Sequence, residues 1–122
     1  MSAPNIILAN TIYGKTELYA ATGTLSNVIV NASGSGQVYK LNSVTYANGN
    51  ANNVPVWVQI HRGNPMVGYD LASSVTVPGY SSLVVVAKDT SIYLEEGDTL
   101  KCNVGSLGVG TTSVVVSYEM IS

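Results

Sequence analysis

Cysteine and histidine, which can pair as nucleophile and base, each occur once in this 122-residue chain. His61 is the sole histidine and Cys102 the sole cysteine, so the one nucleophile–base pair in view would join these two residues. The sequence around neither residue resembles a nucleophile elbow. We therefore expect His61 to lie solvated at a strand end, Cys102 to be a buried, unreactive thiol, and the protein not to be an enzyme.

One acidic cluster could bind a cation. Glu95, Glu96 and Asp98 surround Gly97, and carboxylates on a tight turn could hold calcium if backbone carbonyls completed the oxygen ligands. Acidic turns between strands are more often solvated, however, and an aspartate commonly caps its own turn. Zinc would need several clustered Cys or His ligands, and Gly105 to Gly110 lacks the Lys-Ser or Lys-Thr of a phosphate loop. We expect no metal and no cofactor.

The aromatic residues carry the remaining functional signal. The chain has eight tyrosines, one tryptophan and no phenylalanine, so nearly all its aromatic area has a polar group suited to partly wet surfaces. Trp57 is expected to point outward, where it would meet another subunit, pack under a loop or stack on a sugar. The predicted interface or ligand residues are Trp57, Tyr13, Tyr39 and Tyr80.

The elements that position these residues follow a period of two, which is typical of strands with one buried face. Val54, Val56, Val58 and Ile60 alternate with the face that carries Trp57. The predicted strands are Lys15 to Ala21, Leu25 to Asn31, Val38 to Tyr46, Val54 to Arg62, Ser74 to Val77, Leu83 to Lys88, Thr99 to Val104 and Ser113 to Ile121. Within them, Val28 and Val30 are expected on the core face, and the continuous apolar run Leu83 to Ala87 predicts a central strand covered on both faces.

Turn clusters separate these strands at regular intervals. They are Asn31 to Gly36, Asn48 to Asn53, His61 to Gly68, Pro78 to Ser82, Glu95 to Asp98 and Gly105 to Thr112. About eight strands at this spacing indicate an all-β, antiparallel β-sandwich, with the jelly roll as one form of it and a closed barrel as the structural alternative. We expect residues 1–122 to form a single domain.

The amino-acid composition favours some classes of binding partner and argues against others. Hydrophobic residues make up 46% of the chain and charged residues only 10%, and the net charge is −2. A surface covered by Ser, Thr, Asn, Gly and Tyr suits burial against other subunits, whereas the weak negative charge argues against nucleic acid. The chain has no apolar stretch long enough to span a membrane, and Met1 to Asn10 lacks the features of an export signal. We expect a protein that stays in the cytoplasm until it assembles.

Four segments carry a resemblance to a known family: Ile12 to Thr16, Gly36 to Val44, Leu83 to Leu100 and Ser117 to Ser122. They resemble small virion structural proteins of marine tailed bacteriophages of the cyanophage kind. The resemblance implies a β-rich structural protein, made in the host cytoplasm and present in many copies on the virion as a capsid decoration, neck or tail component. Its partners would be itself, as a homo-oligomer with a trimer favoured, and other virion proteins. The alternative is a carbohydrate-binding or host-adhesion module in which Trp57 stacks on a glycan.

Overall fold

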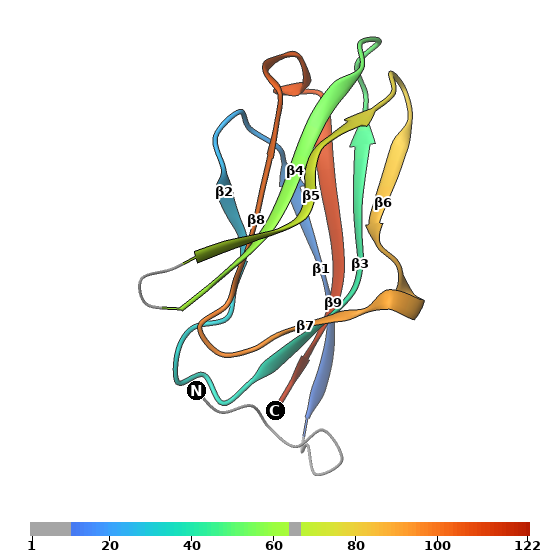
Figure 1. Cartoon of the computed structure of the whole chain (residues 1–122). Coiled ribbons are helices and arrows are strands. Elements are labelled where there is room, and N and C mark those ends of the chain that lie inside the picture. The colour runs from blue at the N-terminus through green and yellow to red at the C-terminus, as the bar shows by residue number, and fades with distance from the viewer. Residues whose placement is uncertain (1–10, 64–66) are drawn as a thin grey trace.

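The computed structural model describes residues 11–63 and 67–122, in which two antiparallel sheets pack face to face (Figure 1). No α-helix occurs in this part of the chain, and it contains two short 3₁₀ helices, η2 (Lys88–Thr90) and η3 (Ser106–Gly108). The strands are β1 (Ile12–Ala20), β2 (Ser26–Val30), β3 (Val38–Asn48), β4 (Val54–Arg62), β5 (Val67–Val77), β6 (Ser82–Val86), β7 (Ile92–Leu94), β8 (Thr99–Val104) and β9 (Thr112–Ile121).

The order of the strands identifies the sandwich as a jelly roll. The first sheet runs β1-β9-β3-β6, with β7 also paired to β3, and the second runs β2-β8-β4-β5. The first strand therefore pairs with the last, β2 with β8, β3 with β6 and β7, and β4 with β5, as if one long hairpin had folded over on itself. The all-β sandwich predicted from the sequence is confirmed, and two separate sheets exclude the closed barrel.

Branched side chains from both sheets fill the core. Val54, Val56 and Val58 on β4 are fully buried, as their alternation predicts, and Cys102 is buried beside them on β8. From the first sheet, Tyr46 reaches across the core and donates its hydroxyl hydrogen to the backbone oxygen of Trp57 at 2.7 Å. This bond satisfies a polar group in an otherwise apolar layer, and burial raises the pKa of the Tyr46 hydroxyl well above its usual value.

Two predictions about individual strands are wrong. A β-bulge between Asn27 and Ile29 reverses the alternation of β2, so that Ile29 is buried and Val30 is exposed. The run Leu83 to Ala87 is not a central strand, because β6 lies at the edge of the first sheet and exposes Val84.

The strand boundaries also differ from those predicted. The expected turn at His61 to Gly68 contains the end of β4 and the start of β5, and its residues 64–66 lie outside the described residues. The three-residue strand β7 was not predicted. Residues 1–10, where we expect no export signal, also lie outside the described part. Among the described residues, no helix is long and apolar enough to cross a membrane.

Candidate functional site

The charged residues are confined to one part of the sandwich. They are Lys15, Glu17, Lys40, Arg62, Asp70, Lys88, Asp89, Glu95, Glu96, Asp98, Lys101 and Glu119. On the paired strands they lie between the middle of the sandwich and the end that holds η2 and β7, drawn at the bottom of Figure 1. The opposite end of both sheets therefore has no charged side chain.

We call this opposite end the neutral end and define it by its four loops, residues 21–25, 49–53, 78–81 and 105–111, drawn at the top of Figure 1. Three large apolar or aromatic side chains are exposed on these loops: Tyr80, Leu107 and Val109. Exposed apolar groups without charges among them are typical of the central part of protein interfaces, where charged residues are depleted.

Asparagines hold three of these loops in fixed positions. The buried side chain of Asn48 donates hydrogen bonds to the backbone oxygens of Asn52 and Val77, at 2.8 and 3.1 Å. Asn50 donates to the backbone oxygen of Leu107 at 2.7 Å, and Asn53 accepts from the backbone nitrogen of Gly79 at 3.1 Å. The neutral end is thus a preformed surface, which reduces the entropy lost on docking.

The loops approach so closely that one of them requires glycine. A side-chain carbon at Gly79 would lie 2.2 Å from the backbone oxygen of Ala51, closer than any real contact allows. The neighbouring Tyr80 has a φ of 53°, in the left-handed region that non-glycine residues rarely adopt, and its backbone nitrogen donates to the backbone oxygen of Asn50 at 3.0 Å. Backbone bonding holds Tyr80 in this conformation with its side chain 76% exposed.

A shallow depression lies beside Tyr80, where the neutral end meets the first sheet. It has a volume of about 460 Å³ and is lined by Tyr80, Asn48, Gly49, Ser81, Thr111 and Ser113, together with Ala47 and Ser82. An exposed aromatic ring next to uncharged hydroxyl groups could bind a neutral polar ligand.

The half of the outer face of the first sheet that adjoins the neutral end continues this uncharged surface. Leu18 on β1 lies opposite Val115 on β9, which lies opposite Thr45 on β3, and Thr45 lies opposite Val84 on β6. Leu18 is 73% exposed, Val84 57% and Val115 36%. We call these four residues the cross-strand row. Directly opposed residues of neighbouring strands point to the same face, so the row forms one apolar band across the sheet.

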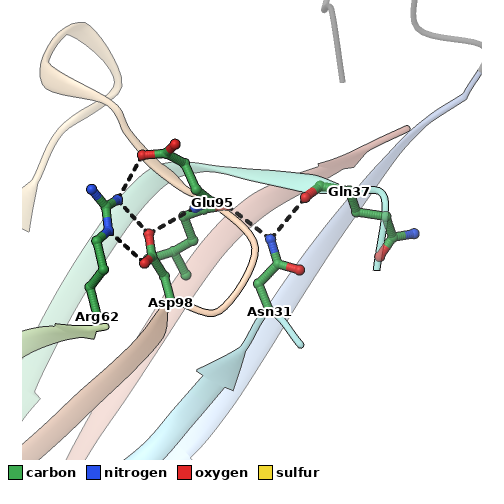
Figure 2. Close-up of polar contacts among 6 residues, drawn as sticks. Asn31, Gln37, Arg62, Glu95 and Asp98 are labelled. Atoms are coloured by element: carbon green, nitrogen blue, oxygen red, sulfur yellow. Dashed lines mark hydrogen bonds and ion pairs between the residues drawn. The ribbon is translucent and has the colours of Figure 1, made fainter. Parts of the chain in front are cut away.

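The other end of the sandwich is organised by an ionic network (Figure 2). Arg62, the last residue of β4, donates from Nε to Oδ1 of Asp98 at 2.7 Å and from Nη2 to Oδ2 at 2.6 Å. Nη2 also lies 2.8 Å from Oε2 of Glu95. These contacts, the hydrogen bonds to Asp98 above all, raise the pKa of the Arg62 guanidinium above its usual value.

Asn31 links the end of β7, which leads into the same turn, to the segment that precedes β3. Its side chain donates to the backbone oxygen of Gln37 at 3.0 Å (Figure 2) and to that of Leu94, the last residue of β7, also at 3.0 Å. Glu96 accepts a hydrogen bond from the backbone nitrogen of Gly36 at 2.5 Å. The acidic cluster singled out in the sequence is therefore paired with Arg62 and backbone N–H groups. In residues 11–63 and 67–122, no three His, Cys, Asp or Glu side chains are grouped as a metal site would require.

His61 and Cys102 are not brought together. The ring Nε2 of His61 lies 2.8 Å from Oε1 of Gln59, whose amide donates to Asp70 at 2.8 Å. Desolvation, and to a smaller extent Lys101, lowers the pKa of His61. Cys102 points into the core, where burial raises its pKa to about 11.

The four aromatic residues named as interface or ligand residues lie apart. Trp57 is half-buried on the outer face of the second sheet, opposite Asn103. Tyr13 is exposed on the edge strand β1, and Tyr80 is exposed at the neutral end. Tyr39 is buried, with its ring centroid 5.7 Å from that of Tyr118. The structure thus brings only Tyr80 into the uncharged surface.

Sequence reasoning missed the residues of the cross-strand row and the exposed Leu107 and Val109. One signal could have indicated them. Four long stretches, residues 18–39, 41–61, 71–87 and 102–118, contain no Lys, Arg, Asp or Glu. In a sandwich whose strands run from end to end, charge-free stretches at such regular spacing place uncharged residues at one end.

Comparisons with known proteins give distant structural likenesses, among them the following two. One comes from a study titled "Bacillus endospore appendages form a novel family of disulfide-linked pili". The match covers 99% of this chain and 96% of the pilus chain, with 16% sequence identity and a TM-score of 0.49. A chain of the T13 IBDV viral particle matches 93% of this chain, with 8% identity and a TM-score of 0.48. This chain spans 31% of that capsid chain. No protein-family model and no curated protein matches the sequence.

At these identities and TM-scores the two structures supply no argument about function. The jelly-roll assignment rests on the strand order of this chain. Neither structure is described as a tailed-phage protein, so the phage resemblance of the sequence stays a prediction.

Proposed function

We propose that this protein is a non-enzymatic structural subunit that assembles through its uncharged surfaces into a tailed-phage particle, as a capsid decoration, neck or tail component. One observation carries the assembly part of the proposal. The neutral end and the adjoining half of the outer face of the first sheet expose Tyr80, Leu107, Leu18 and Val84 with no charged residue among them. Burying such a surface gains hydrophobic free energy without the cost of desolvating charges.

The phage part of the proposal is supported by the sequence likeness at residues 12–16, 36–44, 83–100 and 117–122. In this function the subunit is made in the host cytoplasm and becomes part of the virion. The neutral end contacts neighbouring virion proteins, and the ionic network around Arg62 stabilises the opposite end. No chemical step is involved, because the contribution of the protein is its shape and the surface it buries.

The experiment that tests this function combines light scattering with particle binding. The full chain at micromolar concentration is expected to form a homo-oligomer and to sediment with purified phage particles. A monomer that shows no binding to particles would contradict the proposal. Weaker particle binding by the charged variant Leu107→Lys would show that the neutral end makes the contact. The control is Asp89→Lys, at an exposed residue of η2.

Carbohydrate binding is the second candidate, favoured by the depression beside Tyr80. An exposed ring flanked by the hydroxyl groups of Ser81, Thr111 and Ser113 matches the stacking and hydrogen bonding that sugars need. If this is the function, a glycan array shows binding that Tyr80→Ala abolishes and Trp57→Ala retains. Loss of binding in Trp57→Ala alone would move the site to the second sheet, and an array without signal would remove this candidate.

A further inference from the structure

The outer face of the first sheet has a self-complementary pattern. The cross-strand row places Leu18 at one edge of the sheet and Val84 at the other, with Val115 and Thr45 between them. The residues above and below the row on β9 and β3 are Ser113, Ala47, Ser117 and Ser43, which are small and uncharged. A second flat layer can therefore approach this face along the whole row.

Two charged side chains stand on the same face, nearer the other end of the sheet. Lys40 on β3 lies directly opposite Glu119 on β9, while the adjacent pair Leu41 and Tyr118 points into the core. Glu119 also accepts a hydrogen bond from Asn42 at 3.0 Å. The central strands of the face thus carry one positive and one negative charge at the same level.

We infer that this face binds the same face of a second copy about a two-fold axis that runs parallel to the strands, between β9 and β3. Such an axis exchanges the two edges of the sheet, and it leaves each residue at the same height along the strand direction. Leu18 then meets Val84 of the second copy, and Val115 meets Thr45 of the second copy. By the same operation Glu119 meets Lys40 of the second copy, so the apolar and the charged groups match at once.

An axis at right angles to the strands gives a poorer match. It would place Leu18 against Leu18 of the second copy and reverse the level along the strands, so that Lys40 and Glu119 would face uncharged residues. These charges would lose water without gaining a partner from the second copy. The parallel axis is therefore the favoured arrangement.

The area is sufficient for a specific contact. The four strands β1, β9, β3 and β6 have 9, 10, 11 and 5 residues. At a strand spacing of about 4.8 Å and a rise of about 3.3 Å per residue, the face measures roughly 550 Å² per copy. Two such faces bury roughly 1,100 Å², which exceeds the ~1,000 Å² expected of a biological interface. This inference rests on the proposed assembly function and specifies the second copy as the partner of this face.

Cysteine cross-linking of the full-length chain tests the inference. The double variant Leu18→Cys/Val84→Cys, treated with a short bifunctional maleimide, is expected to give covalent dimers on a denaturing gel. Neither single variant should do so, because equivalent copies of Leu18 lie on opposite edges of the dimer. The native Cys102 is buried and does not compete. Efficient cross-linking of Leu18→Cys alone would overturn the inference in favour of the perpendicular axis.

A second variant covers the case in which the cysteine variant fails to fold. Leu18→Asp is expected to raise the dissociation constant of the dimer at least tenfold in sedimentation experiments. Val67→Asp, at an exposed valine on β5 of the second sheet, should change the dissociation constant of the dimer by less than about twofold. Equal effects of the two substitutions would overturn the inference.

The outcomes also separate this inference from the proposed function. In a trimer, two unlike surfaces meet around a three-fold axis. A trimer that gives no cross-links between Leu18 and Val84 would overturn the two-fold contact and leave the assembly function standing. A monomer that does not bind particles would overturn both.

Discussion

Arg62 binds both carboxylate oxygens of Asp98, whose side chain is completely buried. Oδ2 of Asp98 also accepts a hydrogen bond from the backbone nitrogen of Glu95 at 2.9 Å. The aspartate therefore fixes the turn between β7 and β8, and Arg62 supplies the positive charge that a buried carboxylate needs. The stability of this end of the sandwich depends on the pair.

Replacing the arginine should destabilise the fold. Arg62→Ala leaves Asp98 buried without its counter-charge, so we expect a loss of about 3 kcal/mol in the free energy of unfolding, at the lower end for broken buried pairs because Arg62 is partly exposed. Urea denaturation measures this change. Lys88→Ala, at an exposed lysine on η2, is the control and should change stability by less than about 0.5 kcal/mol. Similar losses in both variants would contradict the role given to Asp98.

The neutral end depends on the close approach of two loops. Gly79→Ala places a methyl group against the backbone oxygen of Ala51, and we expect a loss of about 3 kcal/mol or a rearranged loop. Gly14→Ala is the matched control, because no atom lies within 4 Å of the added carbon, and it should be neutral or slightly stabilising. Thermal unfolding followed by circular dichroism distinguishes the two. Equal melting temperatures would show that the loops are less tightly packed than described.

The thiol of Cys102 should be unreactive in the folded protein. Its pKa is raised from 9.0 to about 11, so the thiolate fraction near pH 8 falls roughly 100-fold, and burial further blocks access. A disulfide reagent that reports thiolate colorimetrically should react slowly with the native chain at pH 8 and at once in denaturant. Rapid reaction of the native protein would show that the core around β8 opens.

Charge at the neutral end should weaken attachment to a particle. Leu107→Lys introduces an ammonium group into a surface without counter-charges, and we expect binding to weaken roughly tenfold, or ~1.4 kcal/mol. Co-sedimentation with particles over a range of protein concentrations gives the dissociation constants. Asp89→Lys, which makes a larger change in charge at the other end, should bind like the unmodified chain. The reverse order of effects would place the contact at the charged end.

Strand positions could be predicted wherever the alternation of side chains is regular. Val54, Val56 and Val58 have the predicted face, because every second residue packs into the core. Val30 was misplaced because a bulge shifts the alternation, and a bulge inserts a residue without a clear sequence signal, whereas Val28 is partly buried against the core as expected. The edge position of β6 follows from the folding-over of the chain, which hydrophobicity alone does not encode.

The candidate site was less predictable. Tyr80 was named from its residue type, but its position beside the depression depends on the loop containing Asn50, which lies about thirty residues earlier. Leu18, Val115 and Val84 share a band only through the register of four strands that are distant in sequence. Single-strand patterns report which face a residue occupies, and the neighbours across the sheet come from the tertiary fold.

The pairing of the first strand with the last affects how the protein can be made. Ile12 lies opposite Ile121, and Thr11 and Ser122 exchange backbone hydrogen bonds of 3.1 and 3.0 Å. On the ribosome, β1 has no partner in its sheet until β9 has emerged, so the first sheet cannot close before then. The outer face of that sheet, which needs β1, β9, β3 and β6 together, therefore exists only after translation has passed β9.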